Sequence, residues 1–140
     1  MEKALLWCGS QFQGEGMERV FVVLGAALAF TAVALGAFGS HGLQGRVSPE
    51  DVAIFETGVR YHMYHALALL AAAGVAARWS GIEVVVAGWL FVGGILVFSG
   101  SLYLLVLTDT RWLGAVTPVG GLAFLVGWLL LAVGAIRGGP

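Results

Sequence analysis

The sequence predicts an all-α integral membrane protein, a four-helix bundle whose helices run up, down, up and down. Of its 140 residues, 59% are hydrophobic and 11% are charged, whereas soluble domains average about 45–50% apolar and 25% charged residues. The mean hydropathy is +0.93. Asp, Glu, Lys and Arg are absent from residues 20–45, 61–77, 84–108 and 112–136. Each of these windows has room for one spanning helix of about 17–25 residues.

The chain divides into a short extension and one membrane domain. Residues 1–16 mix polar, aromatic and glycine residues without a helical period, and we expect a flexible N-terminal extension there. Met17 is typical of the first residue of a membrane protein, so the four-transmembrane-helix domain is expected over 17–140. The single cysteine, Cys8, excludes an internal disulfide and a cysteine-based metal cluster. The helices are predicted at residues 20–38, 49–77, 84–107 and 115–136.

The first predicted helix, 20–38, carries small residues at helical spacing, which allow helix backbones to approach closely in lipid. The stripe consists of Gly25, Ala29, Ala32, Gly36 and Ser40. Gly39 and Gly42 stand on either side of His41. Glycine permits left-handed and tight-turn conformations. The helix is therefore expected to end in such a turn, with the imidazole near the membrane surface.

The second predicted helix, 49–77, has the best-marked start. Ser48 suits an N-cap, Pro49 suits the first helical position, and two acidic residues follow in the first turn. At 1.5 Å per residue the helix is about 43 Å long, so its first two turns should lie outside a hydrocarbon core of about 30 Å. Glu56 and Arg60 are four residues apart and are predicted to pair at the interface.

One face of this second helix changes from polar to small along its length. Tyr61 and His65 are followed at three- and four-residue steps by Ala68, Ala72 and Ala76. This face is expected to point toward protein. The third helix, 84–107, is rich in glycine, and the fourth, 115–136, opens with Thr-Pro and keeps a stripe of small residues.

Because consecutive spanning helices alternate in direction, the polar residues of all four helices should gather on one side of the membrane. The predicted polar cluster, a candidate ligand-binding site, consists of His41, Glu56, Arg60, Tyr61, His62, His65, Ser99, Ser101, Tyr103 and Thr117, with Asp109 on the same side. The other half of the bundle is almost wholly apolar. Positive charges favour cytoplasmic termini by four against three. Without residues 1–16 the count is three against three, which favours neither side.

The sequence resembles the YgdD family of small four-helix membrane proteins, a family of unknown function. The stretches that carry the resemblance are Leu35–Leu43, Tyr61–Ala68, Phe98–Tyr103 and Thr117–Gly121. What the resemblance implies is a multi-pass membrane protein, and it brings no established activity. The expected location is the inner (plasma) membrane.

These features favour a non-catalytic scaffold, assembly or interaction component, and neither an enzyme nor a cofactor is predicted. The expected partners are the lipid bilayer and either a second copy or another membrane protein, whereas a net charge of −1 argues against nucleic acid. One alternative is a metal- or haem-binding protein that uses His41, His62 and His65. Another is an oligomeric transporter of ions or small molecules, although such proteins usually need an ionisable group deep in the membrane. Catalysis would require a nucleophile beside a base, and hydroxyls in membrane helices mostly bond neighbouring backbone.

Overall fold

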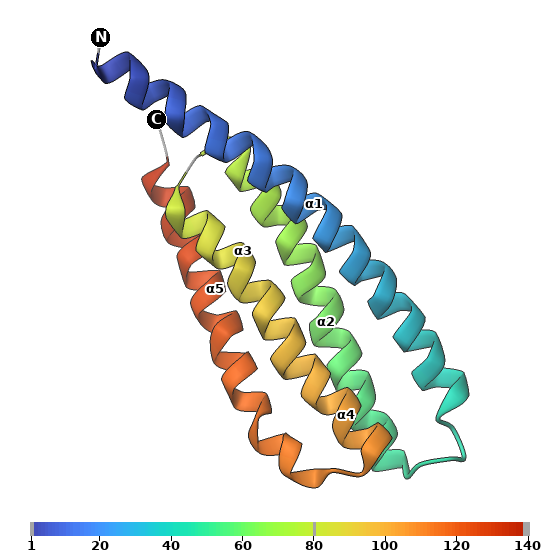
Figure 1. Cartoon of the computed structure of the whole chain (residues 1–140). Helices are drawn as coiled ribbons and strands as arrows, with labels where there is room; N and C mark the ends of the chain where they lie inside the picture. Colours follow the sequence, from blue (N-terminus) through green and yellow to red (C-terminus); the bar gives the residue numbers. More distant parts are fainter. Residues whose placement is uncertain (1, 80, 139–140) are drawn as a thin grey trace.

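The described residues of the computed structural model form four helices, which run antiparallel in one bundle (Figure 1). The structure describes residues 2–79 and 81–138, with side chains from Gly16 onward. The elements are α1 (Glu2–Gly42), α2 (Pro49–Ala76), α3 (Ile82–Gly94), η1 (Ile95–Ser99), α4 (Gly100–Thr108), η2 (Arg111–Ala115) and α5 (Thr117–Arg137). α3, η1 and α4 form one continuous rod. The described residues contain no strand, which confirms the all-α prediction.

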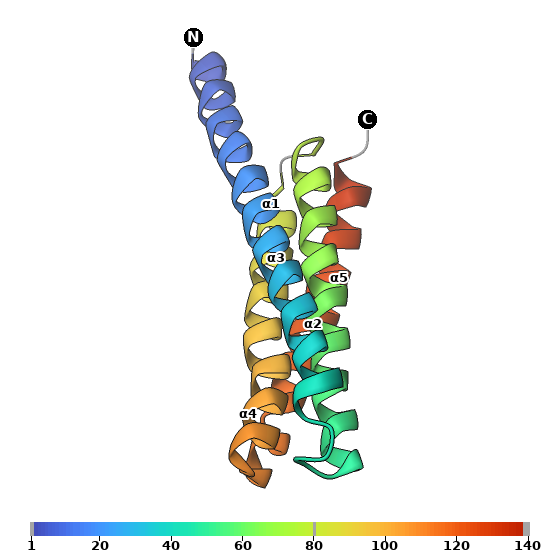
Figure 2. The same ribbon diagram turned by 90° about the vertical axis from the view of Figure 1, so that its right-hand side faces the viewer.

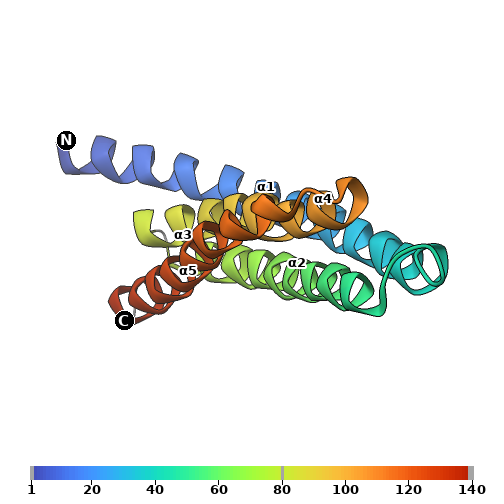
Figure 3. The ribbon, with the colours of Figure 1, turned by 90° about the horizontal axis from the view of Figure 1, so that it is seen from below.

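The rods pack side by side in the order α1, α2, the third rod and α5. In Figure 1, α3 lies between α5 and α2, and α1 flanks α2 on its other side. α2 therefore packs on α1 and on the third rod, while α2 and α5 make few contacts with each other. Large buried side chains fill the interior, among them Phe21, Phe55, Leu69 and Phe91. Figure 3 shows α1 beginning and α5 ending at the same end of the bundle.

Three of the four rods are long and apolar enough to span a membrane by length and composition. They are Gly16–Gly42, Ile82–Thr108 and Arg111–Arg137. α2 is not among them because its middle carries an arginine, two histidines and two tyrosines. Both histidines are buried inside the bundle, with their imidazoles turned toward protein. That α2 is a fourth spanning helix stays a prediction.

The start of α2 follows the predicted capping pattern. The hydroxyl of Ser48 accepts a hydrogen bond from the Asp51 N–H at 3.1 Å and donates one to the Asp51 carboxylate at 2.9 Å. Pro49 occupies the first helical position. The hydroxyl thereby satisfies one of the free N–H groups of the first turn, and the proline has no N–H to satisfy.

The first helix differs from the prediction at both ends. Its backbone is helical from Glu2, where a flexible extension was expected, and the mobility of residues 1–16 stays a prediction. At the other end the helix continues past Phe38 to Gly42, where the Ser40 hydroxyl bonds the Gly36 carbonyl four residues earlier at 3.0 Å. The left-handed turn falls instead at Gly45, with φ +75°, so His41 belongs to the last helical turn. In Figure 2 the N-terminal part of α1 extends beyond the rest of the bundle.

A π-helical turn interrupts the third rod at Ile95–Ser99. The Gly100 N–H bonds to the Ile95 carbonyl, five residues back, where an α-helix bonds four residues back. The wider turn lies directly against α5. A Cβ atom on Gly120 would come within 2.7 Å of the Phe98 Cβ and would also collide with the Phe98 backbone nitrogen. This crossing therefore needs a residue without a side chain.

Candidate binding groove between α2 and α5

A groove of about 770 Å³ lies between α2 and α5, next to the π turn. α2 supplies one wall, η1 supplies Phe98, and the first three turns of α5 supply the other wall. The lining residues are Tyr61, Tyr64, His65, Phe98, Pro118, Gly121, Leu122, Phe124, Leu125 and Trp128. Six of these ten side chains are aromatic rings and none carries a permanent charge.

His65 is buried beside the groove and is held on both ring nitrogens. Its Nδ1 lies 2.7 Å from the Tyr61 carbonyl oxygen, so Nδ1 carries the proton and donates it. Its Nε2 accepts a hydrogen bond from the Trp128 indole N–H at 3.2 Å. The ring also stacks on Phe124, with centroids 3.4 Å apart and planes 6° from parallel. These contacts fix the neutral tautomer and join α2 to α5.

The aromatic wall continues from His65 toward the start of α5. The Tyr61 and Phe98 rings have centroids 4.6 Å apart, and Phe98 lies 5.5 Å from Phe124. Gly94 permits this arrangement, because a Cβ there would meet the Phe124 ring. The π turn and its two glycine crossings therefore place the rings of α2, η1 and α5 next to one another.

Other members of the predicted polar cluster form pairs between helices. His62 Nδ1 lies 3.2 Å from the Tyr103 hydroxyl, which joins α2 to α4. Ser101 Oγ lies 2.9 Å from Thr117 Oγ1, which joins α4 to α5. Ser99 is fully buried in the π turn. The structure therefore distributes these side chains over several helix contacts and does not collect them at one centre.

The remaining members of the predicted cluster do not join these contacts. His41, Glu56 and Arg60 are exposed. The expected Glu56–Arg60 pair is not formed, because Arg60 turns toward Thr57 Oγ1, at 3.2 Å, one turn earlier. The three histidines are also kept apart, since His62 faces α4 and His65 faces α5. Among the described residues, no three side chains of His, Cys, Asp or Glu are placed to hold a metal.

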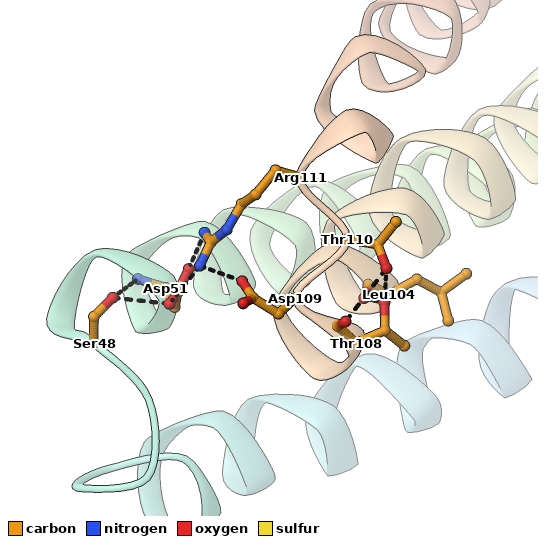
Figure 4. A network of polar contacts seen from close by, with 7 residues as sticks. All are labelled: Ser48, Asp51, Leu104, Thr108, Asp109, Thr110 and Arg111. Atoms are coloured by element: carbon orange, nitrogen blue, oxygen red, sulfur yellow. Dashed lines mark hydrogen bonds and ion pairs between the residues drawn. The ribbon is translucent and has the colours of Figure 1, made fainter.

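An ionic network that the sequence analysis did not identify lies at the end of the bundle beside the groove (Figure 4). Arg111 donates to both carboxylate oxygens of Asp51, at 2.6 and 3.2 Å, and pairs with Asp109 at 2.7 Å. The Arg111 guanidinium and the Ser48 hydroxyl hold the pKa of the Asp51 carboxyl below its ordinary value. Asp109 takes a left-handed conformation, with φ 52°. The network ties the start of α2 to the turn before η2.

Two signals in the sequence could have located the missed residues. Asp51 stands three residues after an N-cap serine, a position whose carboxylate points back toward the helix start. Trp128 lies within an uncharged span, away from the interfaces where tryptophan is usually found. Its indole N–H therefore needs a partner inside the bundle, and His65 provides it.

The fold and the groove define a class of protein, a small multi-pass membrane bundle whose polar groups bond between helices. The chain belongs to the family described as "Protein of unknown function (DUF423)", which matches residues 35–121. The expected resemblance to a membrane family of unknown function is confirmed at this level. The narrower YgdD designation stays a prediction.

Curated relatives share this membrane assignment. The chain is 50% identical to the "UPF0382 membrane protein YwdK" of Bacillus subtilis over 120 residues, which cover 85% of this chain and 98% of the relative. It is 47% identical to the UPF0382 membrane protein SAB0533 of Staphylococcus aureus over 119 residues, 85% of this chain and 97% of the relative. No solved structure matches the chain. The chain is a membrane protein, and its surroundings are therefore a lipid bilayer.

Proposed function

We propose that this protein is a non-catalytic interaction component of the plasma membrane, which binds a lipophilic molecule in the groove between α2 and α5. The observation that carries the proposal is the groove itself, about 770 Å³ in volume and lined by uncharged, mainly aromatic side chains. Small-molecule sites are typically concave, mainly apolar and about 300–1,000 Å³ in volume. A groove of this kind within spanning helices is open to molecules dissolved in the bilayer.

The hydrogen bonds of the polar cluster support a role in binding without catalysis. A general base needs a free acceptor nitrogen within reach of the proton it takes. Both nitrogens of His65 are bonded within the protein. His62 Nε2 has no partner among the described residues but is buried, away from the groove lining. The Ser101 hydroxyl is shared between Thr117 and the Phe98 carbonyl, at 2.9 Å each. No contact favours the metal-binding or transporter alternative, and neither is proposed.

The test is to block the groove and measure what the protein retains. Leu125 lines the groove and is exposed, so Leu125→Trp fills the space without disturbing the interior. Leu129, one turn further along α5, is similarly exposed but lies outside the groove, and Leu129→Trp is the matched control. Both variants and the parent protein are extracted from membranes in polymer-bounded nanodiscs, and the lipophiles in each are quantified by mass spectrometry.

The expected result is one class of lipophile enriched at about one molecule per chain in the parent and in Leu129→Trp, and lost from Leu125→Trp. If all three preparations carry the same lipids as the surrounding membrane, the groove does not select a molecule and the proposal is wrong. A membrane protein that co-purifies and is displaced by Leu125→Trp would identify the groove as a protein contact, which also contradicts lipophile binding.

A further inference from the structure

The charge and the length of the groove restrict what can occupy it. None of its lining residues is Asp, Glu, Lys or Arg, so the groove offers no partner to a charged headgroup. Burying an unpaired charge is costly, and an uncharged ligand is therefore favoured. On α5 the groove runs from Pro118 to Trp128, about 15 Å at 1.5 Å per residue. This is half of a hydrocarbon core of about 30 Å, too short to seat a spanning helix of a partner.

The walls indicate the shape of the ligand. Six aromatic rings line the groove. His65 and Phe124 are buried in its wall and stacked on each other, whereas Tyr61, Tyr64 and Trp128 present exposed faces. Aromatic rings prefer offset-stacked or edge-to-face contact with another ring. A planar ring therefore makes more favourable contacts with these walls than an acyl chain does, because a chain offers no flat face for stacking.

The polar groups of the groove indicate which substituents the ligand ring carries. Tyr61 and Tyr64 line the groove and are 41% and 56% exposed. Their hydroxyls make no hydrogen bond with the described residues, whereas the polar groups of His65 and Trp128 are already paired. A phenol hydroxyl donates to an acceptor oxygen. A ligand with carbonyl oxygens on its ring would satisfy these donors.

We infer that the groove binds a quinone-type lipid, a neutral, planar ring with carbonyl oxygens on an apolar tail. The inference rests on the proposed function and names its ligand class. The ring would lie against the exposed faces of Tyr61, Tyr64 and Trp128, and the tail would leave the groove into the bilayer.

Tryptophan fluorescence provides the test, because quinones quench indole emission on contact. Trp128 lines the groove and is 46% exposed, while Trp89 on α3 is 49% exposed and lies outside it. Two proteins are made, one that keeps only Trp128 and one that keeps Trp128 and Trp89, with the remaining tryptophans replaced by Phe. The groove is therefore intact in both, and the Trp89 emission is obtained as the difference between them. Each is placed in phosphatidylcholine nanodiscs and titrated with decylubiquinone.

The expected result is saturable quenching of Trp128 at about one quinone per chain, while Trp89 is quenched only in proportion to the quinone dissolved in the lipid. Tyr64→Phe in the Trp128 protein should weaken binding about 2- to 10-fold, the loss of one hydrogen bond. Circular dichroism of each protein confirms that the helices are intact.

Dodecanol, a ringless and uncharged chain, distinguishes the two proposals. If dodecanol displaces the quinone at equal concentration, the groove recognises apolar chains, which overturns the quinone inference but supports lipophile binding. Linear quenching of both tryptophans also overturns the quinone inference, and the lipid-retention experiment then decides the proposed function by itself. Unchanged binding in Tyr64→Phe would contradict the role of the phenol donor.

Discussion

At the scale of single residues, the structure pairs several buried polar groups across helices, although His62 Nε2 and Ser99 Oγ have no partner among the described residues. In the bilayer core a polar group cannot form a hydrogen bond with water. Spanning helices therefore carry hydroxyls and imidazoles mainly where a protein partner is available. His65 illustrates this, since one nitrogen bonds its own helix and the other accepts from α5. Replacing such a group removes an attachment between helices as well as a polar atom.

The pair of Ser101 and Thr117 should contribute measurable coupling energy between α4 and α5. A double-mutant cycle with Ser101→Ala and Thr117→Val should give about 0.6 kcal/mol of coupling, with an upper range near 1.7 kcal/mol, as for other hydrogen bonds between membrane helices. The measurement is reversible unfolding in mixed micelles. Thr31 is exposed and bonds only the Ala27 carbonyl on its own helix. A cycle of Ser101→Ala with Thr31→Val should therefore show no coupling, and equal coupling in both cycles would contradict the assignment.

The bond between Asp51 and Arg111 should make stability depend on pH in the acidic range. The pKa of Asp51 is lowered from its ordinary value of 3.8 by Arg111. Its contribution is therefore fully present above the pKa of the unfolded chain and is lost as pH falls through the lower pKa of the folded protein. Asp51→Asn should lower Tm at pH 7 and flatten the dependence of Tm on pH below about 4.

The control for this measurement is Glu56→Gln on the same helix. Glu56 is exposed and has no ion-pair partner among the described residues. Its replacement should leave Tm at pH 7 nearly unchanged. Equal losses of Tm in the two variants would show that the Asp51–Arg111 bond does not stabilise the protein more than an exposed carboxylate does.

At the scale of elements, the π turn, Gly94 directly before it and Gly120 on α5 set the distance between the third rod and α5. Gly94 faces the Phe124 ring, and Gly120 faces the backbone of Phe98. In lipid, helix association depends on packing and on hydrogen bonds, since water is not expelled. A side chain added at such a crossing separates the helices along their whole contact.

Gly120→Ala should therefore destabilise the bundle, by about 1–3 kcal/mol for an overpacked contact. Its Cβ would lie 2.7 Å from the Phe98 Cβ. Gly74 on α2 is the matched control, because a Cβ there meets nothing within 4 Å. Gly74→Ala should leave stability equal or raise it by up to about 1 kcal/mol, the gain in helix propensity. Thermal unfolding of the two variants measures the difference, and similar losses in both would contradict the close crossing.

At the scale of the whole molecule, four antiparallel rods place both ends of the membrane domain on one side. Figures 1 and 3 show the start of α1 and the end of α5 at the same end. The groove and the Asp51–Arg111 network belong to the opposite half. A lipophile that enters the groove therefore approaches from the half of the bilayer farther from the termini.

The charge distribution predicts that the ends lie in the cytoplasm. A fluorescent protein fused after Arg137 should be bright in bacterial cells, because it folds in the cytoplasm. Alkaline phosphatase inserted at Gly45, in the turn between α1 and α2, should be active on the outside. The reverse pattern would contradict the predicted orientation but not the fold. If the reporters place Arg137 and Gly45 on the same side of the membrane, the antiparallel arrangement is contradicted.

The sequence by itself determined the all-α class, the number of helices and the capped start of α2. These follow from local properties, namely uncharged windows and the Ser48–Pro49 start of α2. Only the tertiary structure decided which polar groups meet. The π turn shifts the register of the third rod, and the separation of α2 from α5 opens the groove. Both depend on how whole helices cross, and residues 63 positions apart such as His65 and Trp128 are joined by that geometry alone.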